Sequence, residues 1–119
     1  MLTKPITVVE TQGFVRQAEK IWNEAERVAL IDYMAVNPEA GVVIPGTGGI
    51  RKLRWGRAGS GKRGGARVVY FYYAEDVPLF LLKAYAKNQA ADITSDDKRA
   101  FTVVTEAIKA QHATTRTVL

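Results

Sequence analysis

The segment Arg67–Ala74, RVVYFYYA, is the densest run of β-branched and aromatic residues in the chain, and it constrains the fold more than any other feature. Such a run is typical of a strand in a sheet. Two further strand candidates, Ile50–Trp55 and Leu79–Ala86, flank it. The connections between them, Gly56–Gly65 and Glu75–Pro78, are too short for the crossover that parallel strands need. We therefore expect three neighbouring antiparallel strands.

Helical patterns precede and follow these strands. A short strand candidate, Thr7–Thr11, comes first, and the residues after it place apolar side chains on one helical stripe. Asn23 with Glu26 has the spacing of a capping box that begins a second helix, which should end at Asn37–Pro38 because proline cannot continue the hydrogen-bond ladder. Thr94–Asp97 is typical of the N-terminus of a last helix. The apolar stripes comprise Phe14, Ala18, Ile21 and Trp22, then Val28, Ile31 and Ala35, and finally Ala100, Phe101, Val104, Ala107 and Ile108.

These elements predict an α+β fold, in which an N-terminal strand and helical hairpin plus a C-terminal helix pack on a twisted antiparallel sheet. At 119 residues the chain should form a single domain, residues 1–119. We expect the helices to cover one face of the sheet and to leave the other face open for a ligand. The strands and their ends carry the cations Lys52, Arg54, Arg67, Lys83 and Lys87.

The basic residues of the chain are unevenly distributed. Residues 1–39 carry a net charge of −2 and residues 75–119 are balanced, whereas residues 40–74 contain seven Lys and Arg residues and no Asp or Glu. Solvated faces normally mix both signs of charge. A long stretch without any carboxylate instead indicates a polyanionic partner, which is a nucleic acid, an acidic protein or each in turn.

Several other chemistries lack the residues that they need. Without cysteine, the chain has no disulfide, no thiolate metal site and no cysteine nucleophile. The loop Gly56–Arg63 resembles a phosphate-binding loop, but Arg63 stands where the Mg²⁺-binding Ser or Thr should be, and a strand follows instead of a helix. Two-metal nucleases need clustered carboxylates, which the basic region lacks. The sole histidine, His112, lies in the segment 112–119, where we expect a frayed tail.

The chain shows no sign of a membrane location. No apolar run reaches the length of a membrane-spanning helix, and the first ten residues do not have the pattern of a signal peptide. We therefore expect a cytoplasmic protein.

Three basic segments follow one another along the predicted strands. Pro45–Gly49 (PGTGG) leads into Ile50–Trp55 (IRKLRW), Lys62–Tyr70 (KRGGARVVY) comes next, and Tyr85–Asn88 (YAKN) ends the last strand. A single GG or RK pair is weak evidence, but three segments in this order at hairpin spacing are fairly specific. Over roughly residues 35–112 the chain resembles the RelE/HigB-type toxins of the RelE/ParE superfamily, especially the HigB branch.

This resemblance implies a toxin of a type II toxin–antitoxin module. Such a toxin is a ribosome-dependent endonuclease that cleaves messenger RNA in the decoding site, surrounded by 16S rRNA, and a cognate helix-turn-helix antitoxin silences it. The resemblance implies neither metal nor cofactor, since a cluster of Lys and Arg, often with a Tyr, forms the site. Carried over by position, the catalytic candidates are Lys52, Arg54, Arg67, Lys87 and Tyr85. The candidates for RNA binding are Arg51, Arg57, Lys62, Arg63, Tyr70 and Asn88.

The sequence departs from the RelE pattern at two places. Asn88 stands where RelE toxins have a second arginine, and the carboxy-terminal tyrosine of the family has no clear equivalent, so that Tyr85 or Tyr70 is the candidate substitute. The general base therefore stays open between Lys52, Lys87 and a tyrosine.

Cations alone suffice for this type of cleavage, because the RNA supplies the nucleophile. Its 2′-hydroxyl attacks the adjacent phosphorus and leaves a 2′,3′-cyclic phosphate, so the protein has only to align the chain, transfer protons and stabilise the phosphoryl charge. The planar fork of arginine bonds two phosphate oxygens while it stays charged, which favours Arg54 and Arg67 for the last task.

Two other hypotheses about the function stay open. ParE-like toxins share the scaffold but bind DNA gyrase without catalysis, and measuring mRNA cleavage against inhibition of supercoiling separates the two. A plain nucleic-acid-binding module, or a decayed toxin, would not arrest growth when it is expressed without a partner.

Overall fold

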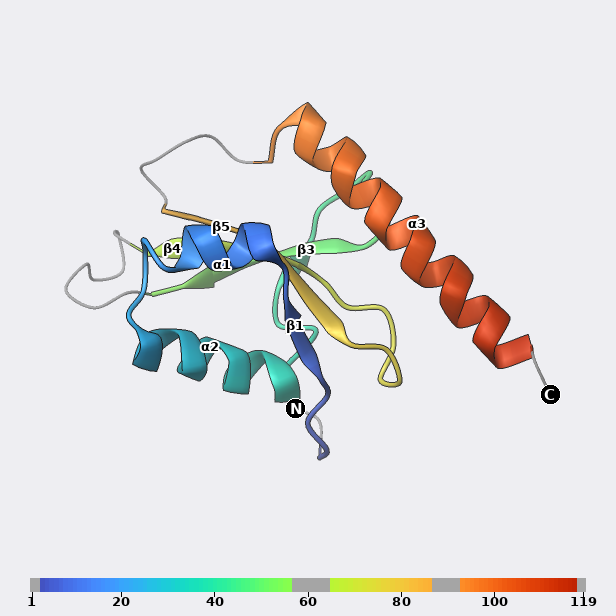
Figure 1. The fold of residues 1–119 in the computed structure, drawn as a ribbon, viewed down its shortest axis with the longest axis horizontal. Coiled ribbons are helices and arrows are strands. Elements are labelled where there is room, and N and C mark those ends of the chain that lie inside the picture. Colours follow the sequence, from blue (N-terminus) through green and yellow to red (C-terminus); the bar gives the residue numbers. More distant parts are fainter. Residues whose placement is uncertain (1–2, 57–64, 87–92, 118–119) are drawn as a thin grey trace.

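In the computed structural model, the described residues are 3–56, 65–86 and 93–117. The elements follow in the order β1 (Val8–Glu10), α1 (Gln12–Ala18), α2 (Glu24–Val36), β2 (Val42–Val43), β3 (Ile50–Trp55), β4 (Ala66–Phe71), β5 (Leu79–Ala86) and α3 (Ser95–Thr117). The strands form one sheet with the order β1-β5-β4-β3-β2, and the helices pack around it (Figure 1). This arrangement confirms the predicted α+β class.

Side-chain caps begin the first two helices. The Thr11 hydroxyl accepts a hydrogen bond from the backbone N–H of Phe14 and donates to the carbonyl of Leu81, so it also fixes α1 against β5. In α2 the predicted capping box is present: the Asn23 side chain accepts from the Glu26 N–H, and the Glu26 carboxylate accepts from the Asn23 N–H. Helix α2 ends at Val36, one residue before the predicted stop.

The strands agree with the sequence prediction only in part. β3 and β5 have the predicted bounds, whereas β4 ends at Phe71 and β2 was not expected. The sheet is also mixed, because β1 pairs with β5 in parallel, so the prediction of a purely antiparallel sheet is wrong for this edge. Short connections force antiparallel pairing only between strands adjacent in sequence, and most of the chain separates β1 from β5.

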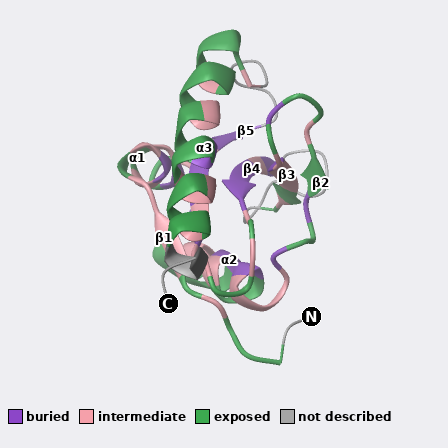
Figure 2. Cartoon of the chain, turned by 90° about the vertical axis from the view of Figure 1, so that its right-hand side faces the viewer, coloured by how far each residue is buried: buried purple, intermediate pink, exposed green. Residues whose placement is uncertain are grey.

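Both faces of the sheet carry helices, which corrects the prediction that one face is left open. α1 and α2 cover one face, where their residues Phe14, Leu30 and Met34 pack on the sheet. We call these residues, together with Ala66, Val68, Tyr70, Leu79, Leu81 and Ala84 of the sheet, the first apolar cluster. α3 crosses the other face (Figure 2), where its Phe101 and Ile108 pack on a second cluster. The second cluster consists of Ile50, Val69, Phe71, Leu82 and Tyr85. The helix is needed on this face because apolar side chains are stabilised when they are removed from water.

α3 is longer than the sequence predicts. The helix continues to Thr117, and the side chain of His112 is 16 % exposed and contacts Asp76, so the prediction of a frayed tail from residue 112 is wrong. Over the part of the chain that the structure describes, no helix is both long enough and apolar enough to cross a membrane.

Candidate nucleic-acid interface

The register of three strands brings the main predicted cations to one face of the sheet. Arg54 of β3 is the Cα partner of Arg67 on β4, and Arg67 is in turn the partner of Tyr85 on β5. Residues directly opposite each other on neighbouring strands point to the same face. Arg54, Arg67 and Tyr85 therefore form one row across the sheet, which we call the first row.

Two further rows cross the strands parallel to the first row. The second row is Lys52–Val69–Lys83, and the third row is Ile50–Phe71–Phe80. The face thus changes from cationic to apolar along its length. α3 packs on this face, because Phe101 and Ile108 contact the cluster that contains Ile50 and Phe71 of the third row and also Tyr85 of the first row.

The two arginines of the first row lie opposite each other, and the register places no acid between them among the described residues of β3 and β4. Like charges at directly opposite positions destabilise a sheet by a few tenths of a kcal/mol to about 1 kcal/mol. Arg54 is exposed and Arg67 is half-buried, with one of its guanidinium nitrogens 3.4 Å from the carbonyl oxygen of Ala66. An anion bound between the two guanidinium groups would turn this repulsion into attraction, so the first row has the charge distribution of a phosphate site.

The second row is partly neutralised. Lys83 forms an ion pair with Asp97 at the start of α3, with 2.5 Å between Nζ and Oδ2. Burial alone would raise the pKa of the Asp97 carboxyl, but hydrogen bonds from Lys83 and from the Thr94 backbone and the attraction of the ammonium group together lower that pKa below its ordinary value. Lys83 is recognisable in the sequence as a strand cation and Thr94–Asp97 as a helix N-terminus, but their pairing is not, because it joins two separate elements.

Tyr70 does not belong to the interface, which corrects the prediction that it binds RNA. Its side chain is 0 % exposed and lies in the first apolar cluster, on the α1 and α2 side of the sheet. The hydroxyl donates to the carbonyl of Pro38 and accepts from the N–H of Gly41, each at 2.8 Å. Burial raises the pKa of this phenol above its ordinary value. Tyr70 therefore cannot stack on a base or act as the general base.

Arg51 also lies away from the other cations. It is the partner of Tyr70 in the register, so it points to the opposite face from Lys52 and Arg54. Its guanidinium group donates to the carbonyl of Gly41 at 2.8 Å and to that of Glu39 at 3.2 Å. These bonds hold the segment after α2, and Arg51 does not join the first row, so its predicted contact with RNA would lie on the opposite face.

Five predicted site residues lie outside the described residues: Arg57, Lys62, Arg63, Lys87 and Asn88. The strand ends nearest to them in sequence are described, and Ala66 is the Cα partner of both Trp55 and Ala86. The indole N–H of Trp22 donates to the carbonyl of Gly56 at 2.8 Å and fixes the end of β3. The three strand ends therefore meet beside the first row.

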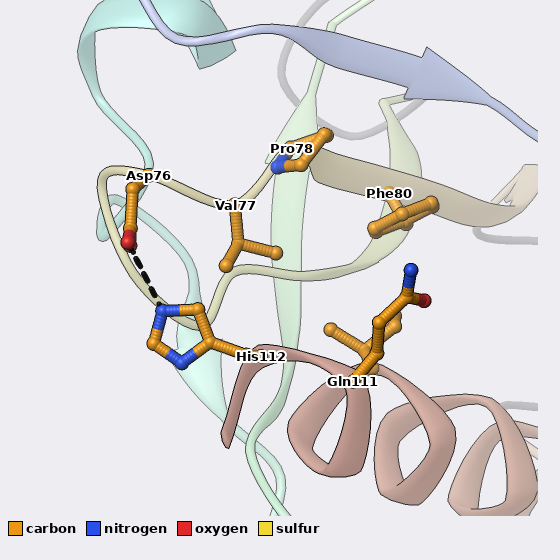
Figure 3. Close-up of a pocket in the computed structure, with 7 residues that line it drawn as sticks. Asp76, Val77, Pro78, Phe80, Gln111 and His112 are labelled. Atoms are coloured by element: carbon orange, nitrogen blue, oxygen red, sulfur yellow. Dashed lines mark hydrogen bonds and ion pairs between the residues drawn. The ribbon is translucent and has the colours of Figure 1, made fainter. Parts of the chain in front are cut away.

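A hollow of about 350 Å³ lies beside the C-terminal half of α3, against the β4–β5 turn. Asp76 and His112 point toward one another at one side of it (Figure 3), with 3.1 Å between His112 Nε2 and the Asp76 carboxylate oxygens. Val77, Pro78 and Phe80 line its apolar part. Among residues 3–56, 65–86 and 93–117, no three His, Asp or Glu side chains gather in a way that could hold a metal ion.

The chain is similar to known proteins in sequence and in fold. The family described as the RelE toxin of the RelE/RelB toxin–antitoxin system matches it over residues 8–118. Its fold is similar to that of a mutant of the E. coli toxin RelE in the free state, with a TM-score of 0.52 and 15% sequence identity over 84% of this chain and 96% of that chain. At this identity the structural likeness concerns the fold alone.

Proposed function

The chain belongs to the RelE toxin family of RelE/RelB toxin–antitoxin systems, and from this premise we propose that it is an endoribonuclease that cleaves messenger RNA on the ribosome. The observation that carries the proposal is the first row, in which two arginines and a tyrosine from three strands lie side by side. The second row adds Lys52 next to Arg54 on the same face. These groups are suited to a phosphodiester, which is anionic and needs its charge stabilised as it reacts.

The proposed cleavage proceeds by attack of the RNA 2′-hydroxyl on the adjacent phosphorus. The bond from phosphorus to the 5′-oxygen breaks, and a 2′,3′-cyclic phosphate remains. Arg54 and Arg67 would bind the phosphoryl oxygens and stabilise the charge that gathers there. A base removes the proton of the 2′-hydroxyl, and an acid protonates the leaving oxygen. Lys52, Tyr85 and Lys87 are the candidates for these two roles.

We further propose that a cognate antitoxin of the RelB type silences the toxin by binding over the first row. The family is defined by such a pairing. An acidic segment of the antitoxin would complement Arg54, Arg67 and Lys52, which are the groups that hold RNA in the proposed mechanism. An antitoxin that leaves this row accessible would act by a different route.

Substitution of Arg67 tests the proposal. Arg67→Ala should lower the rate of messenger RNA cleavage on ribosomes by about 10²-fold, which is the usual effect of removing one preorganised charge donor. The fold should stay intact, because within the part of the chain that the structure describes the guanidinium group makes one long hydrogen bond, to the adjacent carbonyl. The measurements are primer extension on translated messenger RNA and growth after expression without antitoxin.

Arg16→Ala is the matched control. Arg16 is exposed on α1, on the side of the sheet away from the first row, and its removal changes the net charge by the same amount. The control should cleave RNA like the original protein. If Arg67→Ala stayed fully active, the site would be misplaced. If the original protein inhibited supercoiling by gyrase and cut no RNA, the ParE-like alternative would replace the proposal.

A further inference from the structure

The carboxylate of Asp97 takes part in two structures at once. It closes the cap of α3, because its Oδ2 accepts the Thr94 N–H at 3.1 Å while the Thr94 hydroxyl accepts the Asp97 N–H at 3.0 Å. The same Oδ2 accepts a hydrogen bond from Nζ of Lys83 on β5. The N-terminus of α3 is thereby attached to the cationic face of the sheet through one side chain.

Lys83 lies between this cap and the first row. Its side chain is 13 % exposed, and an ammonium group in such a place needs a partner to replace water. Its Nζ lies 5.5 Å from the ring centroid of Tyr85, within the range of a cation–π contact. Tyr85 is itself 9 % exposed and stands directly opposite Arg67 in the first row. A chain of contacts thus leads from Asp97 through Lys83 to Tyr85.

The ion pair between Asp97 and Lys83 also changes the charge of the site. Lys83 shares the second row with Lys52, so without its partner it would be one more cation offered to the RNA backbone. The ion pair neutralises it, while Arg54 and Arg67 stand opposite each other on the same face, and neither has a carboxylate as its register partner. Charge is therefore concentrated at the first row.

We propose that Asp97 is a positioning residue of the RNA cleavage site, which holds the Tyr85 ring beside Arg67 through Lys83 and keeps the Lys83 ammonium away from the substrate phosphates. This inference rests on the proposed function. It assigns Asp97 and Lys83 no contact with the reacting atoms. Their effect is on the geometry of the first row and on which phosphates are bound.

Asp97→Asn is the test, because asparagine keeps an oxygen for the cap but loses the charge that pairs with Lys83. The turnover number for messenger RNA cleavage should fall at least tenfold, since small displacements of aligned groups have effects of this size. KM should stay the same or fall, because the released ammonium adds a phosphate contact. For the same reason RNA binding should neutralise about one more phosphate, so the slope of log K against log salt should become steeper by about 0.7. A purely structural role would not make the salt dependence steeper.

Asp96→Asn is the matched control. Asp96 lies in the same first turn of α3, its side chain is 86 % exposed and its ion-pair partner is Arg99 of the same helix. This variant loses the same charge without touching the sheet, and its turnover number should stay within twofold of the original protein. Lys83→Arg keeps a cation for Asp97 and should keep most of the activity. Lys83→Met leaves the Asp97 anion near the substrate, so its turnover number should fall and its KM should rise.

The inference is overturned if a folded Asp97→Asn protein retains its turnover number within twofold, or if Asp96→Asn loses as much. Should Asp97→Asn fail to fold, the contrast between Lys83→Arg and Lys83→Met decides, and equal activity of these two overturns it. Failure of the proposed function looks different, because the original protein would then cut no RNA in the same assay and the inference would fall with it. If Arg67→Ala is inactive while Asp97→Asn is normal, the proposed function stands and only the role of Asp97 is overturned.

Discussion

At the scale of single residues, two neighbours in one strand serve opposite faces of the sheet. Arg67 belongs to the first row, whereas Tyr70, three residues later, is fully buried on the far side. An odd separation along a strand places two side chains on opposite faces. The sequence left open which face is buried, since both carry aromatic residues. That choice depends on the helices, which is why the sequence predicts Tyr70 at the RNA interface whereas the structure places it in the core.

The hydroxyl of Tyr70 should contribute to stability and not to catalysis. Tyr70→Phe leaves the Gly41 N–H and the Pro38 carbonyl without their partner in a buried place, which should lower the free energy of unfolding by about 1–3 kcal/mol. Urea denaturation measures this loss. The rate of RNA cleavage per folded molecule should stay unchanged. A variant as stable as the original protein, but inactive, would return Tyr70 to the site.

Gly41 shows how closely this tyrosine is packed. A Cβ atom at this position would lie 2.8 Å from the Tyr70 hydroxyl and 3.0 Å from the carbonyl oxygen of Lys52. No side chain fits there without displacing the ring of Tyr70 or the backbone of β3, which carries Lys52 and Arg54. The requirement for glycine comes from a contact distant in sequence, and the sequence pattern of the loop could not reveal it.

At the scale of elements, hairpin spacing determines the local pairing and says little about the rest. β3, β4 and β5 are joined by short connections and pair as predicted, because the two ends of a short loop have few ways to meet. The parallel β1 and the two-residue β2 depend on contacts between distant segments. The same holds for the side of the sheet on which α3 lies, since its amphipathic pattern contains no information about its target.

The face of α3 that packs on the sheet was predicted only in part. Phe101 and Ile108 contact the second cluster, as the stripe suggested, but Ala100, Val104 and Ala107 are exposed and Thr105 is fully buried. Apolar residues lie on two sides of this helix. Periodicity therefore does not distinguish the buried side from the exposed one.

Two substitutions in α3 should separate these sides. Ile108→Ala removes a partly buried side chain from the second cluster and should lower the free energy of unfolding by about 1–2 kcal/mol, less than for a fully buried isoleucine. Val103→Ala removes a side chain that is 70 % exposed and should change stability by less than about 0.5 kcal/mol. Thermal or urea denaturation measures both. Equal effects would mean that α3 packs with a different face.

At the scale of the whole molecule, charge and fold divide the chain into parts with different tasks. Residues 1–39, with a net charge of −2, form β1 and the helices that cover one face. The acid-free residues 40–74 form β2, β3 and β4, which carry most of the cations of the other face. This segregation could be recognised in the sequence, because it needs only a count of charges. The assembly of Arg54, Arg67 and Tyr85 into one row needed the register, which the sequence indicates only for adjacent hairpins.

Binding to RNA should therefore depend on salt in proportion to the phosphates that this face contacts. For a single strand, log K falls by about 0.7 per unit of log salt for each phosphate neutralised. Arg54→Gln removes one exposed cation of the first row, so the slope between about 50 and 200 mM salt should become shallower by about 0.7 for a short RNA that lacks the reactive 2′-hydroxyl. Arg16→Gln on α1 should leave the slope unchanged, because it lies on the other side of the sheet. Fluorescence anisotropy gives both slopes, and an unchanged slope for Arg54→Gln would mean that RNA approaches the molecule from another direction.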